Sequence, residues 1–237
     1  MMKTNKNKGI LILTVIFLLL INGCSNGFMN LDESNKAGEI ISFAGFDWII
    51  LEAQESRALI LTRDIVEQRR FHSADTAFTW EHSEIRAYLN NEFLNRFNAR
   101  DRARIIPTKN KNEDNERFRT VGGADTIDYI FLLSISEVVQ YFGDSGQIEN
   151  RNPFNWGYIN DQFDPNRIAH YKGEPSFWWL RTPGATPGVH YIPPYGWDIE
   201  IDDYRAADIG AGGWICFIGW DVIRTTGGVR PALWLEL

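Results

Sequence analysis

Apolar runs typical of β-strands lie at both ends of the body of this chain, and helical patterns lie between them. Three such runs fall within residues 39–64, and two more fall within residues 214–237. Between them, apolar residues recur with helical spacing in residues 83–97 and 135–142. Strands, then helices, then strands is the order of an α+β domain, so we predict an α+β fold with two or three helices and strands from both ends of the domain.

Local signals predict where the helices begin and end. Ser83 precedes the first helical stripe and is a suitable N-cap. Ser134 and Glu137 have the spacing of a capping box, and Gly143 follows the last periodic residue of the second stripe. Both helices therefore carry their own start signals, and the second also carries a stop signal.

Two β-hairpins are expected from the apolar runs. The run that ends at Ala53 and the run that begins at Arg57 are separated by a short polar break. Residues 214–226 and 228–237 look like the arms of a second hairpin that turns at Gly227-Gly228.

The N-terminal residues have the character of a bacterial export signal. Three lysines are followed by the apolar run Ile10–Ile21, which is too short for an ordinary membrane span. The run ends at Ile21-Asn22-Gly23-Cys24, which resembles the lipobox of bacterial lipoproteins. In that motif a peptidase cleaves just before a cysteine that carries a diacylglyceryl group. Asn22 departs from the small residue more usual at its position.

This resemblance divides the chain into a signal peptide (residues 1–23), a lipidated Cys24 with a tether (residues 24–37) and one domain (residues 38–237). An uncleaved N-terminal anchor helix is the alternative. In both cases we expect an exported protein tethered to the bacterial cell membrane, with its body facing outward. Acyl chains such as palmitate on Cys24 would supply about 0.8 kcal/mol per buried methylene.

The cysteine count limits how the exported body can be stabilised. The chain has two cysteines, and lipid on Cys24 would leave Cys216 without an intrachain disulfide partner. A core must therefore hold the domain together, and 44% hydrophobic residues can build one. Removing the leader takes away three lysines and no acidic residue, so the formal net charge falls from −7 to −10. Such a body does not attract phosphate backbones, so we expect no nucleic-acid partner.

Two motifs suggest chemistry that their surroundings do not support. Residues 143–146 spell the GDSG of trypsin-like proteases, but Gln147 replaces the family's next glycine and the motif follows a helix. We interpret it as a helix end and a turn. The four histidines are isolated, without the spacing of a zinc site. We therefore predict no catalytic residue, no metal and no cofactor.

Three carboxylates alternate with isoleucines in a short run. Asp198, Glu200 and Asp202 would lie on one face of a strand, with Ile199 and Ile201 on the other. Calcium prefers clustered oxygen ligands, so it is the alternative to a solvated strand face above buried isoleucines.

The stretch "FWWLRTPG" (residues 177–184) predicts a buried strand with large side chains on both faces. We expect Trp178 and Trp179 to belong to the core. Arg181 and Arg230 are expected to brace loops by bidentate bonds to carboxylates or carbonyls, which suits a planar guanidinium. The alternative is that Trp179 or Arg181 contacts a ligand.

The segment after this strand, residues 183–213, is rich in Gly and Pro and lacks a regular pattern. Long irregular segments are uncommon unless they are functional or disordered. Its aromatic rings suit stacking on sugars or peptide side chains, and its polar groups suit hydrogen bonding. The predicted ligand-binding residues are His190, Tyr191, Tyr195, Trp197, Asp198, Glu200, Asp202, Tyr204 and Arg205. A passive insertion is the alternative.

Five motifs occur in an order that resembles one uncharacterised bacterial domain family, known only as a domain of unknown function and common in exported proteins of Gram-positive bacteria. They are "GEIISFAGFDWIIL", "TWEHSEIRAYLNNEF", "IDYIFLLSISEVVQYF", "FWWLRTPG" and "GVRPALWLEL". Thr182 replaces the more usual serine of this family, and the 183–213 segment looks longer than usual.

More remotely, "WWLRTPG" and "GGVRPAL" are similar to the paired strands of the C-type-lectin-like fold of formylglycine-generating enzymes. This resemblance implies a C-type-lectin-like domain in which the long segment holds the ligand. The enzymes' chemistry uses a pair of cysteines with copper, which the body with Cys216 alone does not offer. We therefore expect a non-catalytic binding module for a glycan, a cell-wall fragment or a protein. A hydrolase that cleaves cell-wall glycans through loop carboxylates and a purely structural envelope protein are the alternatives.

Overall fold

Two β-sheets form the framework of the computed structural model, which describes residues 37–149, 157–191 and 198–237. The described elements all lie in the compact unit Leu31–Leu237. The chain is α+β, as predicted, with four α-helices in the described part instead of the two or three expected.

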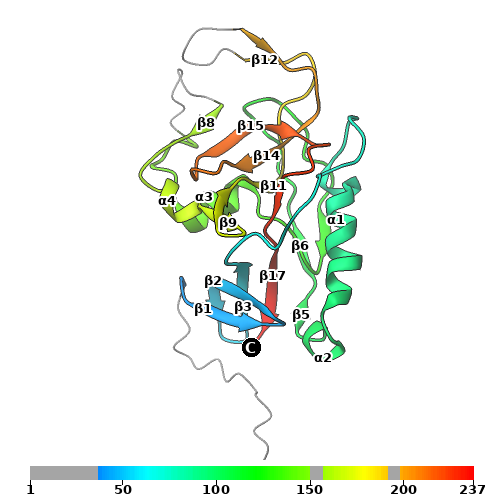
Figure 1. Ribbon diagram of the computed structural model, residues 1–237, viewed down its shortest axis with the longest axis vertical. Helices are drawn as coiled ribbons and strands as arrows, with labels where there is room; N and C mark the ends of the chain where they lie inside the picture. The colour runs from blue at the N-terminus through cyan, green and yellow to red at the C-terminus, as the bar shows by residue number, and fades with distance from the viewer. Residues whose placement is uncertain (1–36, 150–156, 192–197) are drawn as a thin grey trace, which may run out of the picture. The chain divides into compact units, whose positions relative to one another are not determined.

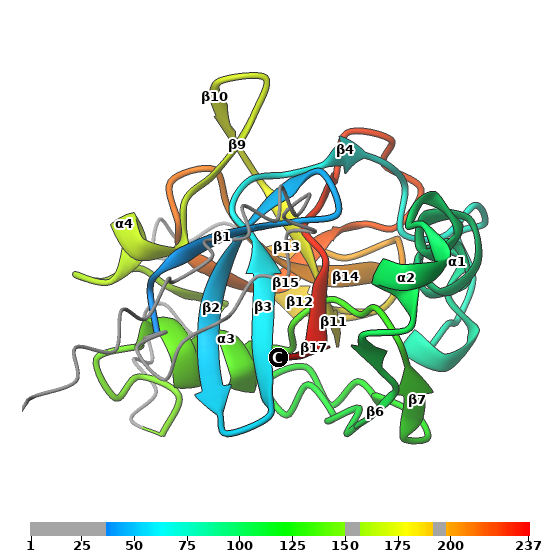
Figure 2. The same cartoon turned by 90° about the horizontal axis from the view of Figure 1, so that it is seen from below.

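The first sheet joins the two ends of the domain. Its strand order is β1-β2-β3-β17-β5, and every pairing is antiparallel. The strands are β1 (Ile40–Phe43), β2 (Phe46–Gln54), β3 (Arg57–Thr62), β5 (Ile105–Ile106) and β17 (Ala232–Glu236). Figures 1 and 2 show the blue N-terminal strands beside the red C-terminal strand β17. The predictions of a β2–β3 hairpin and of strands from both ends of the domain are confirmed.

The second sheet has the order β4-β16-β11-β14-β15-β8. Its strands are β4 (Glu67–Gln68), β8 (Tyr158–Ile159), β11 (Trp178–Pro183), β14 (Arg205–Ile209), β15 (Ile215–Asp221) and β16 (Gly228–Val229). Every residue of β11 is buried, because β16 and β14 flank it on both sides. This interior strand is the rigid support to which the loops described below are hydrogen-bonded.

Two sequence predictions about the second half of the chain are wrong. The last two runs do not form a hairpin, since β15 pairs with β14 and β8 whereas β17 belongs to the first sheet. The intervening β16 pairs in parallel with β11, so the chain crosses from one sheet to the other. The 183–213 segment is not irregular throughout, because β14 is a buried strand at the centre of the second sheet.

Three two-stranded ribbons extend from this framework. They are β6–β7 (Thr108–Asn110 with Thr126–Asp128), β9–β10 (Ala169–Tyr171 with Glu174–Ser176) and β12–β13 (His190–Tyr191 with Ile199–Glu200). Residues 111–125 form the loop that connects β6 to β7, and part of this loop lines the cavity described in the next section.

The helices begin where the sequence predicts. The first starts as α1 (Glu84–Tyr88) and continues as a π-helical turn, η2 (Leu89–Phe93), and a 3₁₀ turn, η3 (Leu94–Arg96). The Ser83 side chain caps it by accepting from the Arg86 amide. The helix α3 (Ile135–Phe142) carries the predicted capping box of Ser134 and Glu137 and ends at Gly143, whose φ is +87°. The remaining short helices are the 3₁₀ turn η1 (Trp80–His82) and the α-helices α2 (Ala99–Arg102) and α4 (Asp164–Arg167).

Tryptophans and arginines share the core. Trp178 and Trp179 have no exposed surface, and their indole N–H groups donate to the carbonyls of Arg167 and Arg69. Arg230 donates to the Thr62 and Arg63 carbonyls at 2.9 and 3.0 Å. Burial lowers the pKa of Arg230 to about 10.

A buried carboxyl and a buried thiol face each other across β14 and β15. Asp208 and Cys216 are registered partners, and both lie in the interior. Burial raises the pKa of the Asp208 carboxyl and of the Cys216 thiol well above their ordinary values. Cys216 is a free cysteine.

In the part of the chain that the structure describes, no helix combines the length and the apolar character that a membrane crossing requires.

Candidate functional site

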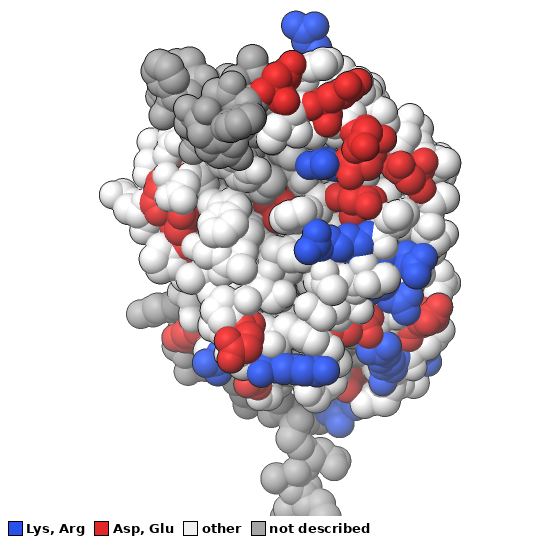
Figure 3. All heavy atoms as spheres, turned by 45° about the horizontal axis from the view of Figure 1, so that its top comes forward, with Lys and Arg blue, Asp and Glu red and all other residues white. Residues whose placement is uncertain are grey.

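Charge is spread unevenly over the surface of the domain. On the face in Figure 3, acidic side chains gather at the upper right, basic ones lie below them, and much of the middle is uncharged. Cavities with polar linings are therefore better guides to a site than the net charge of the chain.

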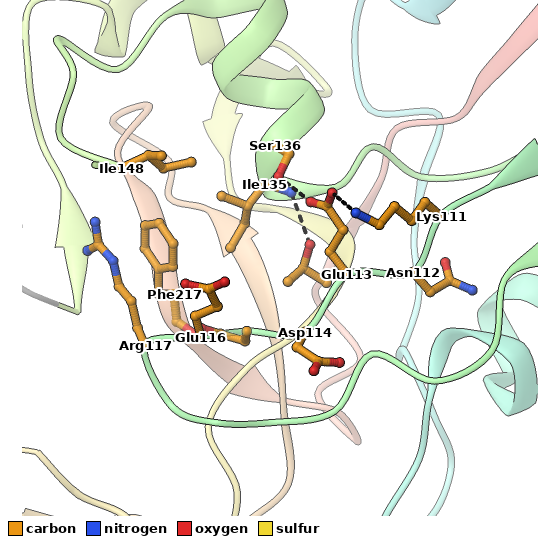
Figure 4. Close-up of a pocket in the computed structure, with 12 residues that line it drawn as sticks. Lys111, Asn112, Glu113, Asp114, Glu116, Arg117, Ile135, Ser136, Ile148 and Phe217 are labelled. Atoms are coloured by element: carbon orange, nitrogen blue, oxygen red, sulfur yellow. Dashed lines mark hydrogen bonds and ion pairs between the residues drawn. The ribbon is translucent and has the colours of Figure 1, made fainter. Parts of the chain in front are cut away.

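A cavity of about 550 Å³ lies beside the loop that follows β6. We call it the Glu116 cavity. Its described lining residues come from this loop, the first turn of α3, the end of β11, the middle of β15 and the turn after α3: Lys111, Asn112, Glu113, Asp114, Asn115, Glu116, Arg117, Ile135, Ser136, Ile148, Thr182 and Phe217. In Figure 4 the Glu116 carboxylate points toward the space beside Ile135 and Phe217, whereas the Glu113 carboxylate lies between Ser136 and Lys111.

The Asn115 side chain anchors this loop to the second sheet by hydrogen bonds. Its side-chain amide donates to the carbonyls of Pro183 and Phe217, both at 2.8 Å. Its backbone also exchanges hydrogen bonds with Thr120, which closes a tight turn. The side chain is 2% exposed, and its Oδ1 has no hydrogen-bond partner among the described residues. The Oδ1 of Asn112, in the same loop, also lacks a partner in the described part of the chain, so the loop presents a fixed wall with two unused acceptors.

Gly122 sets how closely the two arms of the loop approach each other. A Cβ at this position would lie 2.4 Å from the carbonyl oxygens of Asn112 and Glu113, closer than atoms can pack. The Gly122 amide donates to Asp114 at 2.8 Å, and Figure 4 shows Asp114 pointing away from Ile135 and Phe217. Asp114 therefore supports the loop.

Glu113 sits at the N-terminus of α3, where exposed amides favour negative charge. Its carboxylate accepts a hydrogen bond from the Ser136 hydroxyl. It also forms an ion pair with Lys111, with 3.1 Å between Oε1 and the Lys111 Nζ. The Ser136 hydrogen bond is the main reason that the pKa of Glu113 is lowered from its ordinary value. Glu113 is thus an ionised acceptor at neutral pH.

Both basic side chains of the lining are already engaged. Lys111 is paired with Glu113. The Arg117 guanidinium stacks on the Phe217 ring, with 3.6 Å from its central carbon to the ring centroid, and it donates to the Gln147 carbonyl at 3.1 Å. An anionic ligand would have to displace these contacts, whereas the Oδ1 atoms of Asn112 and Asn115 lack a partner among the described residues and can receive a donor.

Arg181, which the sequence predicts to brace loops, and its neighbour Thr182 support this wall. Arg181 donates to both carboxylate oxygens of Glu137 and to the carbonyls of Leu132 and Lys111, the carbonyl bonds measuring 2.8 and 3.3 Å. It therefore ties the start of the loop to α3. Thr182 accepts from the Ile135 amide at 3.0 Å and so fixes the first turn of that helix.

The predicted ligand-binding residues do not form one site. His190 and Asp198 make an exposed pair at 3.1 Å, and Glu200 and Asp202 are exposed. Tyr191 pairs with Ile199 in the β12–β13 ribbon. Tyr204 and Arg205 line a separate cavity at the start of β14. Tyr195, Trp197 and the predicted lipid site Cys24 lie outside the described residues.

The predicted carboxylate face also differs from expectation. Ile201 is buried but Ile199 is 39% exposed, so the isoleucines do not form a buried pair. Within the described residues, no three His, Cys, Asp or Glu side chains come together as a metal site.

Sequence reasoning missed the Glu116 cavity, because residues 109–119 looked like an ordinary charged loop. A usable signal was present: residues 112–116, "NEDNE", carry a side-chain oxygen acceptor at five consecutive positions. Loops that carry polar side chains on a rigid scaffold are common places for binding sites.

Comparison with known proteins places most of the chain in one family. The family described as "Domain of unknown function (DUF6273)" matches residues 55–237. No curated protein matches the chain, and no solved structure matches it.

Proposed function

The chain belongs to the DUF6273 family, and we propose that it is a non-catalytic binding module whose Glu116 cavity takes a small ligand rich in hydrogen-bond donors. A sugar with several hydroxyl groups or an amine-bearing fragment has this chemistry. The observation that carries the proposal is that two buried amide oxygens of the lining, Oδ1 of Asn112 and of Asn115, have no hydrogen-bond partner among the described residues, while the cations Lys111 and Arg117 are already held.

The polar groups of the wall support a donor-rich ligand. Glu113 is held ionised, and the buried Oδ1 of Asn115 lacks a partner among the described residues. A buried acceptor without a hydrogen bond costs about 1–3 kcal/mol, and a ligand hydroxyl or ammonium group would recover part of that cost. The Glu116 carboxylate points toward the same space (Figure 4).

The apolar part of the lining supports a ligand with a flat or carbon-rich body. Ile135, Ile148 and Phe217 border the cavity, so a ring could contact them while its polar groups meet the acceptors. The volume of about 550 Å³ suits a ligand of one to three sugar rings or a short peptide.

Hydrolysis of a glycan is the second candidate, because two glutamates line one cavity. A glycosidase needs one carboxyl group with a raised pKa to act as the general acid. The pKa of Glu113 is lowered instead, so Glu113 is not suited to the role of general acid.

The cellular setting of this module is part of the proposal. The lysine-rich leader and the lipobox-like Ile21–Cys24 support an exported lipoprotein, lipidated on Cys24 and held at the outer face of the bacterial membrane. A C-type-lectin-like domain is supported by the sheet that joins both ends of the domain and by the long connection between β11 and β14. In the Cys24→Ala variant, normal incorporation of labelled palmitate would contradict the lipoprotein assignment.

Calorimetric titration of the full chain with chitotriose and with its N-acetylated form tests the binding proposal. We expect binding of at least one sugar, no release of shorter sugars, and about tenfold weaker binding by Glu116→Gln. Glu174→Gln, an equal change in the exposed β9–β10 ribbon, serves as the control and should bind like the parent. Failure of both sugars to bind, or an equal loss in both variants, would contradict the proposal, and shorter products would favour the hydrolase.

A further inference from the structure

A second cavity, of about 350 Å³, borders the same loop but has a different lining. We call it the Arg119 cavity. Its described lining residues are Ala77, Phe78, Thr79, His82, Arg119, Thr120, Val121, Pro183, Thr186, Tyr204 and Arg205. They come from the segment around η1, the Asn115–Thr120 turn, the residues at and after the end of β11, and the start of β14.

The walls of this cavity are largely apolar. The Phe78 ring packs on Phe71 with 5.1 Å between centroids, which holds it in place. Val121 is 64% exposed, an unusual position for an aliphatic side chain that borders a cavity. Pro183 and Tyr204 complete the apolar surface. A ligand with a carbon-rich body would cover Val121 and gain contact with these side chains.

The charges of the lining have one sign. Arg119 and Arg205 contribute guanidinium groups, and no described lining residue carries a carboxylate. Arg205 is neutralised by Asp203, with 2.5 Å between Nε and Oδ1. The exposed Arg119 side chain makes no hydrogen bond or ion pair to any described residue. In a chain with a formal net charge of −7, this unpaired cation favours an anion at the cavity.

Two hydroxyl groups add hydrogen-bonding capacity. The Oγ1 atoms of Thr79 and Thr120 are buried without a hydrogen-bond partner among the described residues, and both residues line this cavity. A hydroxyl can donate to a carboxylate, and Arg119 can donate with its guanidinium group. Together they offer the donors that one carboxylate needs.

The backbone keeps Arg119 in an uncommon conformation. Its φ is +57°, in the left-handed region that non-glycine residues seldom occupy. The closed turn between Asn115 and Thr120 enforces this geometry, and so the position of the Arg119 backbone is defined before any ligand arrives.

We propose that the Arg119 cavity binds a small monocarboxylate with an apolar body, such as an apolar amino acid whose carboxyl group is free. The carboxylate lies at Arg119, Thr79 and Thr120, and the apolar body contacts Phe78, Val121 and Tyr204. This ligand can be a free small molecule or the carboxyl terminus of a polypeptide. The inference does not depend on a ligand in the Glu116 cavity.

Titration of the full chain with N-acetylphenylalanine and with its carboxamide tests this proposal. We expect the carboxylate to bind about tenfold or more tightly than the carboxamide, and added salt to weaken the difference. Arg119→Gln should remove most of this preference. Lys172→Gln is a matched control, because Lys172 is an exposed cation with a φ of +55° in the β9–β10 hairpin, away from the lining.

A tetrapeptide that ends in phenylalanine distinguishes the two sources of the carboxylate. Tighter binding of the peptide than of N-acetylphenylalanine would assign the cavity to a polypeptide terminus, and equal or weaker binding would assign it to a free carboxylate. Equal affinity for carboxylate and carboxamide, an unchanged preference in Arg119→Gln, or no binding of either probe would overturn the proposal. The melting temperature of each variant shows that it is folded.

Discussion

The Glu116 cavity and the Arg119 cavity share one turn, yet their linings differ in charge and polarity. Residues 115–117 face the first cavity and residues 119–121 face the second. In the first, carboxylates and amides face apolar side chains while Lys111 and Arg117 are engaged. In the second, the Arg119 side chain makes no hydrogen bond or ion pair with a described residue, and no described lining residue is acidic.

This difference shows that neither net charge nor local composition predicts what a cavity can bind. The two linings draw on the same eleven-residue stretch of mixed charge, residues 111–121. Their character depends on which charged groups are already paired within the protein. The predictions below use substitutions that should affect one cavity without the other.

Arg181→Ala should have the largest effect on stability. It removes the bonds that join Glu137, Leu132 and Lys111, and it leaves Glu137 partly buried without its partner. Loss of one partner of a buried charged pair costs about 3–5 kcal/mol. Urea unfolding measures this loss, with the exposed Arg63→Ala as the control. Arg181 donates to the Lys111 carbonyl and so positions the start of the loop. The fraction of the Arg181→Ala variant that remains folded should therefore lose sugar binding at the Glu116 cavity but keep carboxylate binding at the Arg119 cavity.

Asn115→Ala should cost about 2–4 kcal/mol, because two buried carbonyls lose their donor. Asn91→Ala is the control, since the Asn91 amide donates to a carbonyl on an exposed helix surface. Chemical unfolding compares the two. Unlike Arg181→Ala, this change should weaken ligand binding in both cavities, and a loss confined to one cavity would show that the turn does not support both.

Glu113→Gln should change the response of the protein to acid. The folded-state pKa of Glu113 lies below its ordinary value of 4.5, so ionised Glu113 stabilises the fold above that pH. This stabilisation disappears as the pH falls through the lowered folded-state pKa. The site is partly exposed, so the effect is about 1 kcal/mol or less. Melting temperatures between pH 3 and 6 should differ most at the higher pH and converge at the lower one.

Glu116→Gln and Arg119→Gln should have the smallest effect on stability, about 0.5 kcal/mol or less, as for surface substitutions. Each should weaken only the ligand of its own cavity. Measuring both ligands on both variants and on the double variant provides the check. If each substitution weakened the ligand of the other cavity as much as the ligand of its own cavity, the two cavities would be one site.

Local signals in the sequence predicted local structure well. The Ser83 and Ser134 caps and the β2–β3 hairpin depend on residues close together in the chain. The strand Trp178–Pro183 was also foreseen, since a run of large apolar groups needs burial on both faces. These features follow from propensity and hydrophobic pattern alone.

Long-range pairing could not be predicted in the same way. The Gly227-Gly228 turn signal suggested a hairpin, but the parallel contact between Trp178 and Gly228 sends the next strand to the other sheet. The strand Arg205–Ile209 was missed because its small alanines and the acidic residue Asp208 lack a strand pattern, although burial in the fold raises the pKa of that carboxyl. The candidate site was missed for a related reason: the sequence shows acceptors and cations, but not which of them are paired.

The closed turn between Asn115 and Thr120 is a wall of both cavities, and this shared wall has a thermodynamic consequence. A ligand that shifts or stiffens the turn from one side changes the free energy of binding on the other side. Such coupling is reciprocal, so the factor by which the first ligand alters the affinity for the second equals the factor in the reverse direction. A binding module built in this way would respond to the joint presence of two compounds.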